Sequence, residues 1–423
     1  MTAQHLPGDQ AFFAEWAARR PGERRSLARA RAVGTVLGTW DRTPPVLAVV
    51  GSKGKGTAAV HAAAVLSCAT VPEVESRAHI GLITSPGLRV NRERMRFDGV
   101  AISPAEYDVE SARLAAARTA VRQDGSGYLS PTGAYTITGA SWATRRGANA
   151  LVLEEGLGGR SDEVGLFDPQ VVAVTKVFYE HGDVLGPTLD DVARDLLGVV
   201  GQGTRTIVTV EQDVDVTAII EETARKYGTD VVTVSTATAS HAPEALPPLT
   251  RLNAAVGESA ARALTADLGW IVDDPTVATV LRSVRMPGRM STYRRKAGPV
   301  MVDGAISPEG IRAAIDAYRV LREEAGNGDE GLGTVVASFP DTKDAEACFA
   351  ELRDFATVIP ARADDYLAFT KAEALYPEVL PAADALARGL AGGPCLLVGT
   401  QSFVALALDV LDISTDLAYR APG

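Results

Sequence analysis

Five short runs of apolar, mostly β-branched residues recur in the first half of the chain, separated by stretches with helical periodicity or by turns. They occupy residues 46–50, 80–84, 150–153, 171–175 and 206–210. Hydrophobicity within each run is continuous rather than alternating, which is typical of strands covered on both faces. The pattern predicts an α/β fold with a doubly wound, mostly parallel sheet and helices on both sides.

A second alternating set begins near Arg289, after a Pro-rich stretch at 237–248 that suggests an exposed connection. Helical periodicity covers 253–268, and the later strands and helices are expected at 299–302, 308–321, 334–337, 343–355 and 395–398. A chain of 423 residues is too long for one ordinary core. We therefore predict a large domain at 1–292 and a smaller α/β domain at 293–423.

Composition excludes several classes of protein. The chain has neither a basic start followed by an apolar run nor about 18 consecutive apolar residues, so no secretion signal or membrane span is expected. Three separated cysteines form neither a disulfide framework nor a zinc pattern, which favours a cytoplasmic location.

The formal charge of −11 argues against binding to nucleic acid. A local basic cluster remains, and we interpret it as a solvated helix face; it consists of Arg19, Arg20, Arg24 and Arg25.

A glycine-rich loop follows the run at 46–50 and leads directly into a helical stretch. It reads Gly51, Ser52, Lys53, Gly54, Lys55, Gly56 and Thr57. Backbone N–H groups at such a helix start converge on one point, where the helix dipole adds positive potential. Lys55 can neutralise phosphate charge and Thr57 can offer a hydroxyl to Mg²⁺, so the loop favours a nucleoside triphosphate.

The loop departs from the common Gly-x-x-x-x-Gly-Lys-Ser/Thr spacing, because Val49 stands at the first glycine and Gly56 separates Lys55 from Thr57. A dinucleotide loop is the main alternative, since Gly54-x-Gly56-x-x-Ala59 also fits and Glu73 or Glu75 lies about 20 residues further on. Two lysines inside the loop favour the triphosphate.

Further motifs make the chain resemble the folylpolyglutamate synthases and, more distantly, the Mur ligases. The family loop Gly-Thr-Asn-Gly-Lys-Gly-Ser/Thr is similar to 51–57, and its Thr-Ser-Pro-His-Leu with a following Glu-Arg is similar to 84–88 and 93–94. The family sequence Glu-Val-Gly-Leu-Gly-Gly-Arg-x-Asp is matched by 154–162 and Asp-His-x-x-x-Leu-Gly-x-Thr by 180–188. Shorter matches follow in family order at 253–254, 287–289 and 303–305.

This resemblance implies a P-loop ATPase domain followed by a Mur ligase C-terminal-like domain. It implies an ATP-dependent amide ligase that activates a small-molecule carboxylate as an acyl phosphate, which an amine or amino acid then attacks. By family position the Mg²⁺ ligands are Thr57, Ser85, Glu154 and His181, and Lys55 contacts the phosphates. Asn253 would contact the adenine, and Arg289 and Asp303 the nucleotide from the domain interface. Lys55, Glu154 and His181 are the predicted catalytic residues.

The residues themselves suit this chemistry, because Mg²⁺ prefers oxygen ligands and phosphoryl transfer needs mainly positioned charges. Other interpretations remain open: Asn253 can equally cap its helix, and His181 can be a surface histidine.

Four departures from the family concern a second metal site and the substrate side. Leu196 stands where the family has a carbamylated lysine that binds a second Mg²⁺, and the adjacent Asp195 should point elsewhere on its helix. Ile306 and Ser307 replace a histidine and an asparagine. Gly87 replaces the histidine of Thr-Ser-Pro-His, and Ala134 and Tyr135 replace Phe-Glu in the motif Thr-x-Phe-Glu.

We therefore predict a ligase with a diverged substrate, acting as a monomer or small homo-oligomer. The alternatives are a true folylpolyglutamate synthase, a degenerate nucleotide-binding regulator or partner subunit, and a free-standing ATPase or small-molecule kinase.

Overall fold

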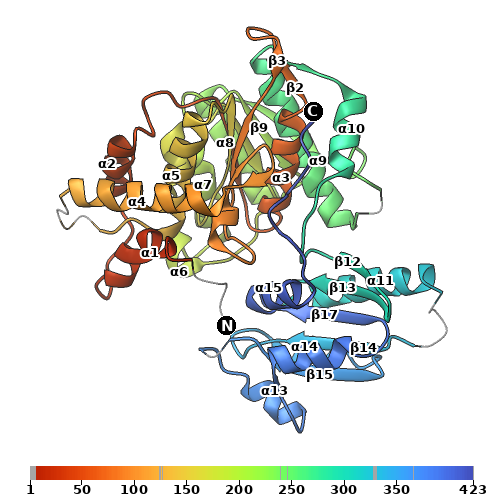
Figure 1. Cartoon of the computed structure of the whole chain (residues 1–423). Helices are drawn as coiled ribbons and strands as arrows, with labels where there is room; N and C mark the ends of the chain where they lie inside the picture. The colour runs from red at the N-terminus through yellow and green to blue at the C-terminus, as the bar shows by residue number, and fades with distance from the viewer. Residues whose placement is uncertain are drawn as a thin grey trace. The chain divides into compact units, whose positions relative to one another are not determined.

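The computed structural model describes residues 6–122, 125, 127–238, 240–244, 246–326, 331–364 and 366–422. These residues form two compact units (Figure 1). The large unit contains Leu6–Gly87, Arg92–Arg285 and residues from Asp416 onward, and the small unit contains Leu88–Asn91 and Met286–Thr415. The boundary after residue 292 stays a prediction about independently folding domains.

An eight-stranded sheet forms the centre of the large unit within the described residues. Its order is β10 (Asp230–Val234), β9 (Thr206–Val210), β8 (Val171–Val174), β1 (Val46–Val50), β7 (Ala150–Glu154), β4 (Ile80–Ile83), β5 (Met95–Phe97) and β6 (Val100–Ala101). The first six strands pair in parallel, whereas β5 and β6 are antiparallel additions. The predicted doubly wound α/β class is confirmed.

Helices cover both faces of this sheet. Alternate residues of β1, namely Val46, Ala48 and Val50, enter a core with α5 (Pro131–Arg145), α7 (Leu189–Leu196) and α8 (Val214–Tyr227). Because side chains alternate along a strand, the intervening residues face the opposite side. There α3 (Lys55–Leu66) and α9 (Pro248–Asp267) lie side by side (Figure 1).

Helix α9 begins five residues before the predicted start at 253, inside the stretch expected to be a connection. Pro248 causes no break there, because proline suits the first turn of a helix, where no internal N–H bond is lost.

The strand order determines where a site can form. Strand β1 lies between β7 and β8, with Val49 opposite Glu154 and Val50 opposite Val174. From β1 the chain first adds strands on one side, at β4 and β7, and then crosses to the other side, at β8. The direction in which strands are added therefore reverses at β1, while the strands themselves stay parallel. In open α/β sheets, ligands bind outside the carboxyl ends of the strands at such a reversal. The loops after β1, β4, β7 and β8 all end there.

The remaining elements of the large unit surround this sheet. They are α1 (Asp9–Ala18), α2 (Leu27–Leu37), η1 (Asn91–Arg94), α4 (Pro104–Ala120), η2 (Glu163–Phe167), α6 (Gly182–Leu185), η3 (Leu197–Val199) and α10 (Asp274–Arg282). A small antiparallel sheet joins β11 (Ile271–Val272), β2 (Ala69–Val71) and β3 (Ser76–Arg77).

The C-terminal segment from Asp416 returns to the large unit after the small unit is complete. The N–H of Ala101 donates to the carbonyl of Asp416 at 2.8 Å, and the N–H of Ala418 donates to Gly99 at 2.8 Å. The carbonyl of Ala418 in turn accepts the N–H of Arg285 at 2.7 Å. The segment therefore links the β5–β6 turn to the last residues before Met286.

The small unit contains a six-stranded sheet among the residues described. Its order is β12 (Ser291–Arg295), β13 (Gly298–Asp303), β17 (Cys395–Gly399), β14 (Thr334–Ser338), β15 (Thr357–Arg362) and β16 (Leu380–Pro381), with only β12–β13 antiparallel. Its helices are α11 (Pro308–Glu324), α12 (Ala345–Ala350), α13 (Thr370–Leu375), α14 (Ala382–Leu390) and α15 (Gln401–Val410).

Helix α12 is shorter than the helix predicted at 343–355, which continues as turns after Ala350. In the described part of the chain, no helix is long and apolar enough to cross a membrane.

Candidate active site

The loop at 51–57 is shaped by two glycines in the left-handed region. Gly51 has φ 129° and Gly54, which precedes the first turn of α3, has φ 92°. A Cβ atom at Gly51 would lie 2.3 Å from Thr175 Oγ1, and one at Gly54 would lie 2.1 Å from Asn253 Nδ2. Side chains would therefore be strained and blocked at both positions. Asn253 is thus placed against the loop, as expected of a residue near the nucleotide.

Lys55 is held at the centre of this loop. Its ammonium donates to the carbonyl of Gly51 at 2.7 Å and lies 3.1 Å from Oε1 of Glu155. Burial alone lowers the pKa of the ammonium, but the carboxylates of Glu155 and Glu154 outweigh burial and raise it. These carboxylates therefore favour the charged form of Lys55, and its predicted phosphate contact stays a prediction.

Glu154 and Ser85 meet beside the same loop. The backbone N–H of Ser85 donates to Oε2 of Glu154 at 3.0 Å. A Cβ atom at Gly56 would lie 3.5 Å from both oxygens of the Glu154 carboxylate, so Glu154 faces the start of α3. The buried Thr57 follows Gly56 in the first turn of α3. Lys55, Ser85 and Glu154 thus lie close together, Lys55 after β1, Ser85 after β4 and Glu154 at the end of β7.

These residues fit Mg²⁺ in the chemistry of their donors. Ser85, Thr57 and Glu154 offer hydroxyl and carboxylate oxygens, and Mg²⁺ is commonly held by one or two such groups together with water and phosphate oxygens. Within the described ranges, no group of three or more His, Cys, Asp and Glu side chains could hold a metal ion. Mg²⁺ at this site would therefore need hydroxyl, water or phosphate ligands as well.

His181 occupies a different environment. It is exposed, has φ 51°, and directly precedes the short helix α6. Its predicted role as a metal ligand stays a prediction.

Sequence reasoning missed a second group of buried charges around the loop 154–163. Asp162 accepts the N–H groups of Gly156 and Leu157, both at 3.1 Å, and Arg25 donates to Asp162 at 3.2 Å. Arg25 also donates to the carbonyl of Leu157. The interpretation of Arg25 as part of a solvated helix face is wrong, because residues 19–25 are not helical and the Arg25 side chain turns inward to balance buried carboxylates.

Glu163 and Glu155 are the other carboxylates that the sequence did not single out. Burial, with a neighbouring carboxylate, raises the pKa of Glu163 to about 7. Burial likewise raises the pKa of Glu155 to about 8, although Lys55 opposes the shift. The only sequence signal was two pairs of adjacent acids in a glycine-rich segment, which does not reveal burial.

Leu196, at the position of the family lysine, packs in the core, and its neighbour Asp195 makes hydrogen bonds to the loop 154–163. Leu196 is 2% exposed and belongs to the core of the large unit, so no metal ligand stands there. Asp195 accepts the N–H of Gly159 at 3.0 Å and the hydroxyl of Ser161 at 2.5 Å. Asp195 therefore fastens the middle of the loop 154–163.

In the small unit, Asp303 is the last residue of β13 and accepts the N–H groups of Met290 at 2.7 Å and Ala305 at 2.8 Å. Burial raises the pKa of Asp303, and the Met290 hydrogen bond and the charge of Arg289 oppose the shift. Ser307 caps α11 by accepting the N–H of Gly310 at 3.3 Å. Arg289 and Asp303 are thus neighbours, and their predicted contact with nucleotide stays a prediction.

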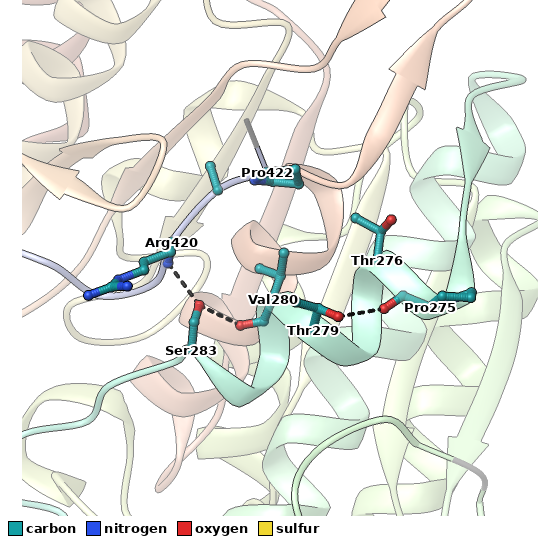
Figure 2. Close-up of a pocket in the computed structure, with 8 residues that line it drawn as sticks. Pro275, Thr276, Thr279, Val280, Ser283, Arg420 and Pro422 are labelled. Carbon is teal, nitrogen blue, oxygen red and sulfur yellow. Dashed lines mark hydrogen bonds between the residues drawn. The ribbon is translucent and has the colours of Figure 1, made fainter.

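A groove of about 520 Å³ lies elsewhere in the large unit, between α10 and the C-terminal segment (Figure 2). Within it, Ser283 accepts the N–H of Arg420 at 2.9 Å and donates to the carbonyl of Val280 at 2.7 Å. None of the predicted site residues lines this groove. Its polar groups serve the local backbone, so we do not assign the active site to it.

Comparisons with known proteins agree with the geometry at the loop. A probable bifunctional folylpolyglutamate synthase/dihydropteroate synthase of Halobacterium salinarum is 29% identical over 89% of this chain and 50% of its own length. A dihydrofolate synthase/folylpolyglutamate synthase of Bacillus subtilis is 23% identical over 69% of this chain and 71% of its own. The chain is therefore similar in sequence to folylpolyglutamate synthases.

The chain spans about half the length of its Halobacterium relative. Its fold is that of the apo form of Lacticaseibacillus casei folylpolyglutamate synthase, with a TM-score of 0.78 at 20% identity, covering 95% of this chain and 99% of the other. A search against protein-family models found no match.

Proposed function

We propose that the chain is an ATP-dependent ligase that joins a small-molecule carboxylic acid to an amine or amino acid through an acyl phosphate. One observation carries the proposal: a phosphate-type loop, the Lys55 ammonium and the Glu154–Ser85 pair meet at the strand reversal of the large sheet. A curated relative bears the name of such a synthase, and a solved relative is described as a complex with an ATP analogue and folate.

In the proposed reaction, a carboxylate oxygen of the acid attacks the γ-phosphorus of ATP and ADP leaves. The amine then attacks the acyl carbon, and inorganic phosphate departs as the amide forms. Lys55 and the N–H groups of 51–57 would hold the phosphates in line. Thr57, Ser85, Glu154 and His181 would hold Mg²⁺, which when bound neutralises phosphate charge. Asn253, Arg289 and Asp303 complete the proposed nucleotide contacts.

The substrate is proposed to differ from the family's usual pair. The polar groups that the family motifs carry are changed at Tyr135, Gly87, Ile306 and Ser307. In the loop, by contrast, the three glycines, Lys55 and Thr57 are kept. We also propose a cytoplasmic enzyme without a nucleic-acid partner, acting as a monomer or small homo-oligomer.

A substrate screen tests the proposal. Purified full-length chain is incubated with Mg·ATP and pairs of acids and amines, including folate with glutamate, while ADP release and product mass are recorded. We expect at least one pair to stimulate ADP release and give an amide. A stable phosphorylated product would instead establish a kinase, and ATP binding without ADP release for any pair would support the degenerate nucleotide-binding protein. Failure to bind ATP would contradict the proposal.

A further inference from the structure

A buried set of side chains connects helix α1 with the loop that carries Ser85. The hydroxyl of Tyr135 lies 2.6 Å from that of Tyr107, which donates to Asp9 Oδ1 at 2.5 Å. The ring of Phe12 stacks on Tyr135 with centroids 3.9 Å apart and planes within 2°. Because the proton of Tyr107 is used on Asp9, Tyr135 donates to Tyr107. One face of the Tyr135 ring and its hydroxyl therefore have defined partners, Phe12 and Tyr107.

Arg94 covers the other side of this ring. Its guanidinium carbon lies 4.6 Å from the centroid of Tyr135, which is a cation–π distance. Nη1 of Arg94 donates to Oγ of Ser85 at 3.4 Å. The carbonyl of Arg94 also accepts the N–H of Thr84 at 2.9 Å, so the two segments run side by side. Tyr135 thus supports the guanidinium that contacts the predicted metal ligand.

Two contacts fix the orientation of Ser85. Its N–H donates to Glu154 and its Oγ accepts from Arg94. A serine hydroxyl has two lone pairs and one proton. With one lone pair used by Arg94, the second lone pair and the proton remain for a cation and a phosphate oxygen.

We propose that Tyr135 is a positioning residue that acts through Arg94 to orient the Ser85 hydroxyl toward the metal–nucleotide complex. This inference rests on the proposed function. The family motif has a glutamate at this position, which could pair with an arginine by charge. A tyrosine supports Arg94 with its ring face instead, and its hydroxyl leads through Tyr107 to the carboxylate of Asp9.

Mn²⁺ binding is the readout that a purely structural role would not change. The full chain is mixed with a non-hydrolysable ATP analogue, and free Mn²⁺ is counted by electron paramagnetic resonance. Tyr135→Leu removes the ring and should weaken Mn²⁺ binding about tenfold, whereas Tyr135→Phe keeps the ring and should change it less than about threefold. Binding of the analogue without metal should change less than about twofold in either variant.

A double-mutant cycle tests the route through Ser85. Ser85→Ala should itself weaken Mn²⁺ binding, and adding Tyr135→Leu should then change it by less than about twofold, because the hydroxyl to be oriented is gone. Tyr419→Leu is the matched control, since Tyr419 is a fully buried tyrosine of the same unit. It should lower the melting temperature and leave Mn²⁺ binding unchanged.

The outcomes separate the two proposals. Additive losses in the cycle, or unchanged Mn²⁺ binding in Tyr135→Leu, overturn the positioning role and leave the proposed function intact. Absence of analogue-dependent Mn²⁺ binding in the unmodified chain overturns the proposed function itself. If Tyr135→Leu does not fold, Arg94→Lys replaces it in the same cycle, because lysine keeps the charge and loses the planar group.

Discussion

Two pairs of adjacent acidic residues bound the same glycine-rich loop, and they have opposite surroundings. Glu154 and Glu155, at the end of β7, face the phosphate loop, where they contact the N–H of Ser85 and the ammonium of Lys55. Asp162 and Glu163, eight residues later, face the protein itself. Their partners are backbone N–H groups of the loop, a hydroxyl and a guanidinium, supplied by Gly156, Leu157, Val164, Ser130 and Arg25.

Burial does not distinguish these pairs, since all four residues are buried. Nor does the pKa, because burial raises it to about 8 for Glu155 and to about 7 for Glu163. A perturbed carboxylate is only a candidate for a functional site, so its place in the fold has to separate the two pairs. Lys55 and Arg25 are each held by a carbonyl and a carboxylate, but Lys55 lies in the proposed phosphate loop, whereas Arg25 lies outside that loop. The first pair should therefore control activity and the second should control stability.

Lys55→Ala should give the largest effect on activity. Unchanged activity would contradict the assignment of activity to the first pair of acids. Removing the ammonium paired with Glu155 takes away the proposed phosphate contact, so kcat/KM for ATP should fall about 10³-fold. The measurement is ADP release under the substrate pair found in the screen. Lys226→Ala, at the exposed end of α8, is the control and should retain activity.

Asp162→Ala should act mainly on stability. It removes the nearer of the two carboxylates that pair with Arg25 and leaves two loop N–H groups without their acceptor, which should cost about 3 kcal/mol of unfolding free energy. Urea denaturation measures this loss. Nucleotide affinity of the folded fraction should change less than about threefold. A large loss of affinity with unchanged stability would contradict the division between the pairs.

Glu163→Gln should remove a pH dependence of stability. The folded pKa of about 7 lies above the ordinary 4.5 of the unfolded chain, so the native state holds an extra proton between these values. The contribution of Glu163 to the unfolding free energy should therefore be largest below pH 4.5 and fall by about 3 kcal/mol as the pH rises through 7. Denaturation of the unmodified chain and of Glu163→Gln between pH 4.5 and 8 measures the difference. Parallel curves would show that Glu163 is ionised throughout.

Asp195→Asn should give the smallest effect, because it weakens only the fastening in the middle of the loop. An amide can still accept one of the N–H bonds from Gly159 or Ser161, so the loss should be about 1 kcal/mol. Denaturation measures it, and kcat should fall modestly as the loop loosens. An increase in stability would mean that the Asp195 charge opposes the nearby acids more than it holds the loop.

Much of the fold and part of the site were predictable from the sequence. Strands at 46–50 and 206–210 have the predicted bounds, because continuous apolar runs directly reflect burial on both faces. The loop at 51–57 was recognisable because its glycines are required by backbone geometry.

Pairings across the fold were not predictable. Arg25 meets Asp162, and Tyr107 meets Asp9, only because distant segments come together. Local periodicity carries no information on such contacts. Helix 343–355 was overestimated for a related reason: its apolar spacing persists through residues that the structure folds as turns.

The return of residues 416–422 to the large unit has a consequence for synthesis on the ribosome. Residues 286–415 emerge and can assemble before the bonds from Ala101 and Arg285 to this segment exist. The large unit, although it is mostly translated first, is completed last. Shortening the chain at Thr415 should therefore impair the large unit rather than the unit next to the cut, and limited proteolysis during translation would reveal that order.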